Sequence, residues 1–245
     1  MQMNRFYKDY QIEYDDCGEN GLLRLPNLID LFMETSEGQL ANGPASSQGM
    51  QEKGLGWVVT QYEFSFSRLP QAKEKVRLWT DASGYNRFLC YRNFGLEDEA
   101  GNDMITVRSQ WIVLDLEKRK LLPVNEKLVA DLKAPKLTKL PRFQKLRPLD
   151  QYDHEQNYRV RYYDIDLNHH VHNSRYLDWI MDSLPRDFLN RYVPASLVIK
   201  FDKEIQYGEE VTCQATYAPE ELTSSHALTH HGDVMALCEV KWREM

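Results

Sequence analysis

The stretch Tyr10-Gln-Ile-Glu-Tyr-Asp-Asp16 recurs later in the chain as Tyr158-Arg-Val-Arg-Tyr-Tyr-Asp164, at an offset of 148 residues. The register continues beyond both stretches without a gap, so that Asp30 falls on Asp178. A repeat that keeps residue types and apolar pattern together is typical of a chain built from two similar units. We therefore expect a tandem architecture.

Each stretch leads into a segment with the apolar spacing of an amphipathic helix. The residues at this spacing are Leu25, Leu28, Ile29, Phe32 and Met33 in the first copy and Tyr176, Leu177, Ile180, Met181 and Leu184 in the second. They form one stripe along each helix, which predicts that one face of each helix is buried.

Strand patterns follow each helix. Apolar and polar residues alternate over residues 61–66, 76–80, 197–202, 211–217 and 236–242. Turn residues at 100–102 and 207–209 predict hairpins. A helix with one apolar stripe needs a sheet to cover it, so we expect an α+β fold in which each unit wraps a curved antiparallel sheet around its helix. Joining the two sheets edge to edge would remove two exposed edges.

The first copy contains an insertion. After the helix the offset falls from 148 to 135, so the first copy is longer by about 13 residues. The extra residues fall on the weakly patterned stretch 41–49, whose Gly, Pro and Ser content is typical of a loop. This loop is either a lid or tunnel wall, or a plain surface insertion.

A basic connector separates the copies. Residues 133–148 hold six basic residues, three prolines and no acid, in a chain of net charge −7. The prolines favour an extended linker. The positive charge either attracts an acidic partner or is simply solvated. We expect an amino-terminal unit over residues 1–132, the linker over 133–150 and a carboxy-terminal unit over 151–245.

Composition excludes several classes of protein. The 245 residues are 42% apolar and 27% charged, which argues against a disordered chain, and the net charge of −7 disfavours nucleic-acid binding. No apolar run approaches the roughly 20 residues that cross a bilayer. The amino terminus resembles neither a signal nor a transit peptide. The four scattered cysteines form no CxxC pair, which favours a reducing cytoplasm.

The second copy carries a polar segment just before its helix. In an extended lead-in, Asp166, Asn168 and His170 would point to one side by alternation. A carboxylate, an amide and an imidazole would then converge near a helix amino terminus, where backbone N–H groups favour a developing negative charge. These are the groups needed to attack a carbonyl carbon.

The repeat supplies an internal control for this interpretation. Leu22 stands in the place of His170, and Leu69 stands in the place of Glu204 in the shifted register. Both ionisable groups therefore have apolar counterparts in the first copy. This asymmetry predicts that only the carboxy-terminal unit retains chemistry.

Each of these residues also has a structural interpretation. Asp166 and Asn168 are common turn and capping residues, His170 could be a satisfied core histidine, and Glu204 could be a surface ion-pair partner. A metal site would require His170 and His172 to lie close to the histidines of residues 225–231. The spacing of the two groups in the sequence does not predict that they do. No cysteine lies near the histidine segment in sequence.

The sequence resembles the acyl-acyl carrier protein thioesterases, the family of the plant plastid enzymes and their bacterial relatives. The family pattern Asp-x-Asn-x-His-x-x-Asn is matched by Asp166, Asn168, His170 and Asn173, and the family's downstream catalytic Glu by Glu204. The likeness also covers residues 57–60, 79–87 and 109–113, and so spans nearly the whole chain. It implies a tandem (double) hotdog fold.

The resemblance further implies hydrolysis of acyl-acyl carrier protein to free fatty acid in fatty acid biosynthesis, without cofactor or metal. Glu204 would activate water, His170 would stabilise charge and shuttle a proton, Asn168 would polarise the carbonyl, and Asp166 would orient His170. In a second scheme Asp166 is a nucleophile that forms a transient anhydride.

Binding roles are expected at two places. The acyl chain would lie along apolar residues that are otherwise plain core, and the acidic carrier protein would dock on basic residues of the linker. The expected substrate-binding residues are Leu28, Phe32, Met33, Trp57 and Asn173 for the acyl group and Lys136, Lys139 and Arg142 for the carrier.

Three departures from the plant pattern and several alternatives stay open. Ile205 replaces a plant Cys, which argues against a thiol mechanism, and the replaced positions His169 and His172 are not expected to be essential. The plant targeting extension is not seen, which points to a bacterial cytoplasmic form. Alternatives are an acyl-CoA thioesterase, a hotdog dehydratase and a non-enzymatic acyl-binding protein. Monomer and homodimer are both open.

Overall fold

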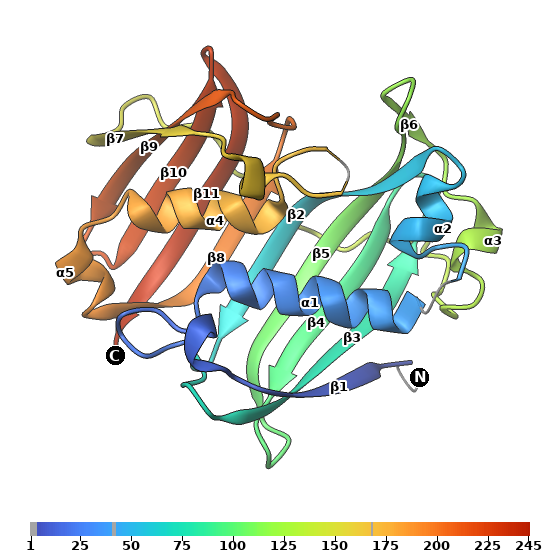
Figure 1. The fold of residues 1–245 in the computed structure, drawn as a ribbon, viewed down its shortest axis with the longest axis horizontal. Helices are drawn as coiled ribbons and strands as arrows, with labels where there is room; N and C mark the ends of the chain where they lie inside the picture. Colours follow the sequence, from blue (N-terminus) through green and yellow to red (C-terminus); the bar gives the residue numbers. More distant parts are fainter. Residues whose placement is uncertain (1–3, 41–42, 168) are drawn as a thin grey trace.

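The computed structural model describes residues 4–40, 43–167 and 169–245, and these form one continuous antiparallel sheet with helices over one face (Figure 1). The strand order is β1-β3-β4-β5-β2-β8-β11-β10-β9-β7, and β6 pairs with β5. The strands are β1 Phe6–Gln11, β2 Leu55–Phe66, β3 Lys75–Tyr85, β4 Cys90–Glu97, β5 Asp103–Asp115, β6 Lys120–Leu122, β7 His154–Arg159, β8 Tyr192–Phe201, β9 Glu210–Ala218, β10 Thr223–His230 and β11 Asp233–Glu244.

Two helices supply the apolar stripes that the sheet covers. The helical segments are α1 Leu25–Leu40, α2 Ser47–Gln51, α3 Glu126–Val129, α4 Asn173–Asp182 and α5 Arg186–Leu189, with 3-10 turns η1 Tyr14–Asp16 and η2 Tyr162–Asp164. Both predicted helices are confirmed, although Leu184 lies beyond the end of α4. Their buried faces join a single core cluster that extends through both units. None of the described helices is long and apolar enough to cross a membrane.

The predicted repeat is visible in the elements themselves. β1 and β7 occupy matching positions at the offset of 148, as do η1 and η2. β3 and β9 begin at Lys75 and Glu210, which matches the second offset of 135. The two half-sheets join through β2 and β8, where residues 61–65 pair with 196–200. The edge-to-edge tandem predicted from the repeat is therefore confirmed.

One of the two predicted hairpins is wrong. Residues 100–102 do connect the paired strands β4 and β5, with Gly101 in the left-handed region at φ +83°. Residues 207–209 form a turn, but they connect β8 to β9, which are not neighbours in the sheet. Because β8 already pairs with β2 and β11, the chain has to cross to the far side, and the turn closes instead on Val160.

The helix α2, which follows the extra residues of the first unit, lines a cavity. α1 has 16 residues against 10 in α4, and α2 follows it, capped by the Ser46 hydroxyl, which accepts a hydrogen bond from the Gly49 N–H. The Trp57 indole N–H of β2 donates to the carbonyl oxygen of Ala45 at 2.9 Å. The described part of the insertion is thus fixed to the sheet.

Residues 133–150, the predicted linker, form no helix or strand apart from a bridge at Lys136, and hydrogen bonds attach them to the sheet. Leu137 N–H donates to the Tyr85 carbonyl at 2.7 Å, which adds a short parallel bridge beside β3. Further along, Gln144 N–H donates to Glu63 of β2, and its side-chain amide donates to Glu239 of β11, each at 2.6 Å. Because these partners belong to different units, the linker also ties the two half-sheets together.

A buried histidine predicts a pH-dependent stability. His226 on β10 is 2% exposed, and burial lowers its pKa to about 3. The unfolded chain binds a proton there below about pH 6.5, so the unfolded state gains protons and stability falls as the pH decreases from 6.5 toward 3. We expect a loss of about 1.4 kcal/mol per pH unit from this group.

Urea unfolding at pH 7.5 and 5.5 measures this effect. His226→Gln should remove the histidine's share of the pH dependence, whereas His154→Gln, at an exposed position on β7, should retain it. An unchanged pH dependence in His226→Gln would contradict the prediction.

Candidate active site

The segment before α4 is a tight loop, which corrects the expected extended lead-in. Asp166 N–H donates to the His170 carbonyl at 2.9 Å, and Ile165 and Val171 form an antiparallel bridge around this pair. The reversal depends on His169, which adopts the left-handed conformation at φ +65°. Asp166 and His170 are therefore brought together across a turn, and not by alternation along a strand. Asn168 lies outside the described residues.

A backbone hydrogen bond places this loop next to Glu204. The Asp166 Oδ1 accepts from the His170 N–H at 3.4 Å, and Val171 N–H donates to the Ile205 carbonyl at 3.0 Å. His170 Nε2 then lies 3.1 Å from Glu204 Oε2, with 18% and 28% of these side chains exposed. The structure thus brings three of the four expected catalytic residues together.

The first unit contributes a residue that the sequence analysis missed. The Arg119 guanidinium forms an ion pair with Glu204, through the same Oε2 atom that faces His170. Arg119 lies in the turn between β5 and β6, in the left-handed conformation at φ +53°. No spacing in the sequence relates it to Glu204, since the contact depends on how the two units join.

The first unit has apolar residues at the positions that correspond to His170 and Glu204. Leu23 N–H donates to the Pro70 carbonyl at 2.9 Å, which is the counterpart of the bond from Val171 to Ile205. Leu22 and Leu69 therefore occupy the places of His170 and Glu204 in three dimensions as well as in sequence. The first unit therefore has the same backbone hydrogen bond as the second, but it has no counterpart of the His170–Glu204 pair.

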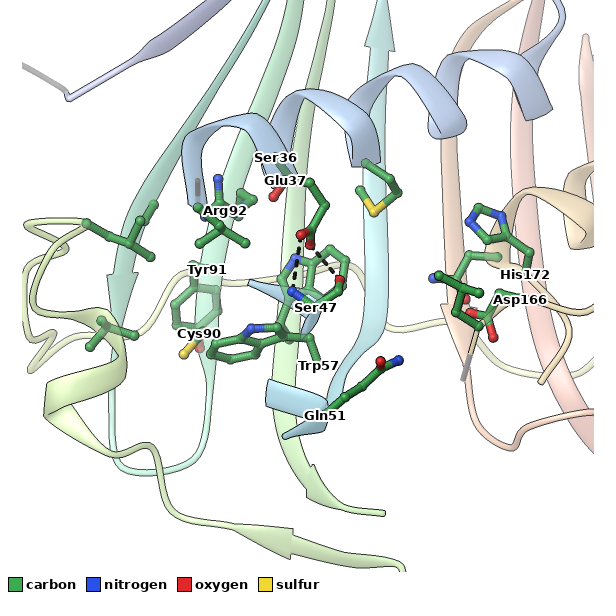
Figure 2. Close-up of a pocket in the computed structure, with 18 of the residues that line it drawn as sticks. Ser36, Glu37, Ser47, Gln51, Trp57, Cys90, Tyr91, Arg92, Asp166 and His172 are labelled. Atoms are coloured by element: carbon green, nitrogen blue, oxygen red, sulfur yellow. Dashed lines mark hydrogen bonds between the residues drawn. The ribbon is translucent and has the colours of Figure 1, made fainter. Parts of the chain in front are cut away.

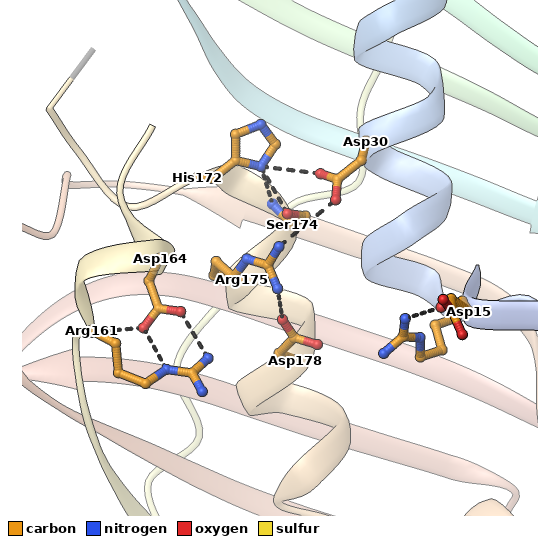
Figure 3. Close-up of polar contacts among 9 residues, drawn as sticks. Asp15, Asp30, Arg161, Asp164, His172, Ser174, Arg175 and Asp178 are labelled. Atoms are coloured by element: carbon orange, nitrogen blue, oxygen red, sulfur yellow. Dashed lines mark hydrogen bonds and ion pairs between the residues drawn. The ribbon is translucent and has the colours of Figure 1, made fainter. Parts of the chain in front are cut away.

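A polar cluster joins the amino terminus of α4 to α1 (Figure 3). His172 is the N-cap of α4, and its Nδ1 accepts from the Ser174 N–H at 3.3 Å. The same Nδ1 lies 3.3 Å from the carboxylate of Asp30 on α1, which also faces Arg175 at 3.9 Å. His172, a position for which the resemblance implies no essential role, therefore caps one helix and contacts the other.

A cavity of 940 Å³ extends from this loop into the first unit. Asp166 and His172 lie on one side of it, and Trp57, Tyr91 and Arg92 on the other, below α1 (Figure 2). The wall is largely apolar, and the residues that form it include Met33, Leu40, Trp57, Tyr91, Trp111, Val129 and Leu132. The volume lies within the range of cavities that hold elongated small molecules.

The cavity separates the expected acyl-binding residues into two groups. Met33, Trp57 and Asn173 line it. Leu28 and Phe32 do not, because they face the sheet and are 0% and 2% exposed. Phe32 packs against the Phe94 ring at 5.2 Å between centroids. Leu28 and Phe32 therefore lie in the core of the first unit and not on the described wall of this cavity.

The linker residues expected to meet the carrier lie outside this cavity. Lys136 is exposed and pairs with Glu126 at 2.7 Å. Lys139 and Arg142 line a second cavity of 730 Å³ between the linker and the sheet, where Arg108 stacks on the Phe143 ring at 5.0 Å.

Two other kinds of site, a cysteine nucleophile and a bound metal ion, receive little support from the described residues. Burial raises the pKa of Cys90, on the cavity wall, to about 12, so its thiol is neutral at physiological pH. In the described part of the chain no group of three or more His, Cys, Asp or Glu residues could hold a metal ion. His226, from the second histidine group, instead hydrogen-bonds Ser183 and Ser224.

Two family models together match almost the whole chain. The amino-terminal domain model of the acyl-ACP thioesterases matches residues 3–132, and the carboxy-terminal domain model matches residues 148–244. The chain belongs to the acyl-ACP thioesterase family. The second match includes the loop of Asp166 and His170 together with Glu204.

Plant relatives of this thioesterase-family chain are longer. A chloroplastic palmitoyl-acyl carrier protein thioesterase of Gossypium hirsutum is 25% identical over 215 residues, which cover 81% of this chain and 52% of the relative. A chloroplastic oleoyl-acyl carrier protein thioesterase of Coriandrum sativum is 25% identical over 215 residues, covering 80% and 58%. The chain thus spans a little over half the length of these relatives.

Solved structures confirm the tandem hotdog fold. A Lactobacillus plantarum protein provisionally named oleoyl thioesterase is 29% identical, with a TM-score of 0.94 over 100% of this chain and 98% of that one. A 12:0-ACP thioesterase of Umbellularia californica has the same fold at 17% identity, with a TM-score of 0.84 and 98% of each chain covered.

The contact between His172 and Asp30 can be measured as a coupling free energy. We expect His172→Ala to destabilise the protein by about 1 kcal/mol through loss of the cap. The contact with Asp30 is favourable only when Nδ1 carries a proton, and Nδ1 then no longer accepts from Ser174. For the protonated imidazole, the double variant with Asp30→Ala should lose roughly 0.5 kcal/mol less than the sum of the single losses. Urea unfolding provides the four values. Glu34→Ala, which lies on the same helix and pairs with Lys8, should be additive with His172→Ala; equal additivity for Asp30 would sink the prediction.

Proposed function

We propose that this protein hydrolyses the thioester that joins a fatty acyl chain to acyl carrier protein, releasing free fatty acid. The observation that carries the proposal is the contact of His170 Nε2 with Glu204 Oε2 at 3.1 Å, beside a loop whose Asp166 lines a largely apolar cavity of 940 Å³. Family membership and the substrates in the names of the plant relatives support the same reaction. The four cysteines are all free, which fits the cytoplasm expected from the sequence.

The pair can divide the proton transfers of hydrolysis. Glu204 accepts a proton from a water molecule as its oxygen attacks the thioester carbonyl carbon, and the carbon–sulfur bond then breaks. Glu204 passes this proton to His170 across their 3.1 Å contact, and His170 donates it to the departing sulfur, which leaves as a thiol. Arg119 holds the Glu204 carboxylate in place through its ion pair. The reaction consumes one water and needs no other reactant.

Asp166 has a positioning role in this scheme. Its backbone and carboxylate both pair with the backbone of His170, so it fixes the turn that presents the imidazole. The second scheme, in which Asp166 attacks the carbonyl carbon and water cleaves the resulting anhydride, uses the same site. Single turnovers in heavy-oxygen water distinguish them, because label entering Asp166 requires the anhydride.

We assign different tasks to the two units. The amino-terminal unit, residues 1–132, holds the acyl chain in the cavity, and the carboxy-terminal unit, residues 151–245, supplies the catalytic residues. Burial of each methylene is worth roughly 0.8 kcal/mol, so the length of the cavity selects the length of the chain. Residues 133–150, with Lys139 and Arg142, supply positive charge for an acidic carrier protein.

Replacing each of the three described site residues tests the proposed reaction. We expect Asp166→Asn, His170→Ala and Glu204→Gln each to lower kcat by about 100-fold or more, since positioned acid–base groups contribute that much. Thiol release from acyl carrier substrates of graded chain length measures the effect.

Glu155→Gln, which makes the same charge change at an exposed position on β7, is the matched control and should retain full activity. Unchanged turnover in all three site variants would refute the assignment. Absence of thiol release by the unmodified protein from every acyl thioester would instead favour a non-enzymatic acyl-binding role.

Carrier docking makes a separate prediction. The double variant Lys139→Glu with Arg142→Glu should raise KM for acyl carrier protein by about tenfold with little change in kcat, because charge complementarity acts mainly on encounter. Acyl-pantetheine, which is neutral and lacks the carrier, should be hydrolysed as before.

Steady-state kinetics at two salt concentrations check this prediction, because salt screens the attraction in the unmodified protein. Lys75→Glu, at an exposed position on β3, is the control substitution. An equal rise in KM for both substrates would exclude docking on the linker.

A further inference from the structure

A buried arginine faces the cavity far from the catalytic loop. Arg92 on β4 is 8% exposed and lines the cavity below α1 (Figure 2). Its Nη1 donates to the side chains of Gln39 at 2.5 Å and Thr80 at 2.9 Å. Its other guanidinium nitrogens, Nε and Nη2, have no hydrogen bond to any described residue.

No carboxylate among the described residues hydrogen-bonds this guanidinium, although Asp81 and Glu37 act on its charge from a longer distance. Among the described residues no carboxylate lies within 4.0 Å of it, so its hydrogen bonds go only to neutral groups. Glu37 lies on the same cavity wall, but both of its oxygens accept from Ser47. Burial lowers the pKa of Arg92 to about 10, which still leaves a cation at neutral pH. A cation so placed favours a ligand that brings an acceptor atom.

The position of Arg92 is set by α1. Asp30 of this helix contacts His172 next to the catalytic loop, and Gln39 of the same helix contacts Arg92. Nine residues of α-helix separate these contacts, a rise of about 14 Å. A chain whose thioester lies at the loop would therefore reach Arg92 with its far end, after passing Met33 and Leu40.

We propose that Arg92 is a receptor for an oxygen atom near the far end of the acyl chain, so that the preferred substrates include fatty acyl groups with a distal hydroxyl or oxo group. The inference rests on the proposed function and names its substrate class. A plain hydrocarbon that reached this point would cover the guanidinium without supplying an acceptor. A distal oxygen supplies an acceptor to Arg92, the only lysine or arginine among the described residues that line the cavity.

Matched pairs of acyl carrier substrates test this inference. Each pair has the same number of carbons, one member saturated and one with a terminal hydroxyl, and chain length is varied. The ratio of their kcat/KM values, hydroxylated over saturated, should pass through a maximum of about ten- to a hundredfold at one length, since a hydrogen bond to a charged group is worth that much. At shorter lengths the hydroxyl meets apolar wall, and the ratio should be one or less.

Three variants separate the outcomes. Arg92→Met should lower the maximum ratio to about one, Arg92→Lys should retain part of it, and Arg77→Met, at an exposed position on β3, should leave it unchanged. If Arg92→Met slows both members of the pair equally, Arg92 is only a tie between α1 and the sheet, and the inference is overturned. A flat ratio at all lengths in the unmodified protein overturns it without any variant, while the proposed hydrolysis still stands. Only a failure to hydrolyse every substrate would count against the proposed function itself.

Discussion

The pairing of β2 with β8 sets the geometry of the whole molecule. This short row of hydrogen bonds, between residues 61–65 and 196–200, joins two half-sheets that would otherwise each end in an open edge. It places α1 and α4 over the same face, where Asp30 can reach His172. Residues of both units line the cavity, with Trp57 and Arg92 from the first and Asp166 from the second, so the junction also holds its two sides together.

The repeat explains why so much of the fold could be predicted. Helix and strand patterns are local in sequence, and two copies in register confirm each other, so the positions of β1, β7, β3 and β9 follow from two offsets. The errors arose where local pattern does not determine long-range pairing. The sequence shows that residues 207–209 form a turn. It does not show that the strands joined by this turn, β8 and β9, lie apart in the sheet. The chain reverses at His169 through a left-handed backbone conformation, which cannot be predicted from the sequence because residues other than glycine rarely adopt it.

The site was predictable to a similar degree and for similar reasons. His170 and Glu204 stand out because their counterparts Leu22 and Leu69 are apolar, and the structure brings the pair to 3.1 Å. No pattern in the sequence marks Arg119 as a site residue, since its contact with Glu204 forms only when the two half-sheets are joined. The apolar stripe of α1 marks a buried face, but periodicity does not distinguish residues that face the sheet, such as Phe32, from those that face a cavity, such as Met33.

The ion pair between Arg119 and Glu204 has a consequence for any exchange of halves between relatives. Arg119 of the first copy contacts the Glu204 carboxylate of the second, so a substitution of either residue alters the ion pair that they form. Chimaeras that exchange whole halves between relatives would inherit a foreign partner at this carboxylate unless the β5–β6 turn travels with it. The surroundings of the Glu204 carboxylate therefore depend on both copies, through Arg119 of the first and His170 of the second.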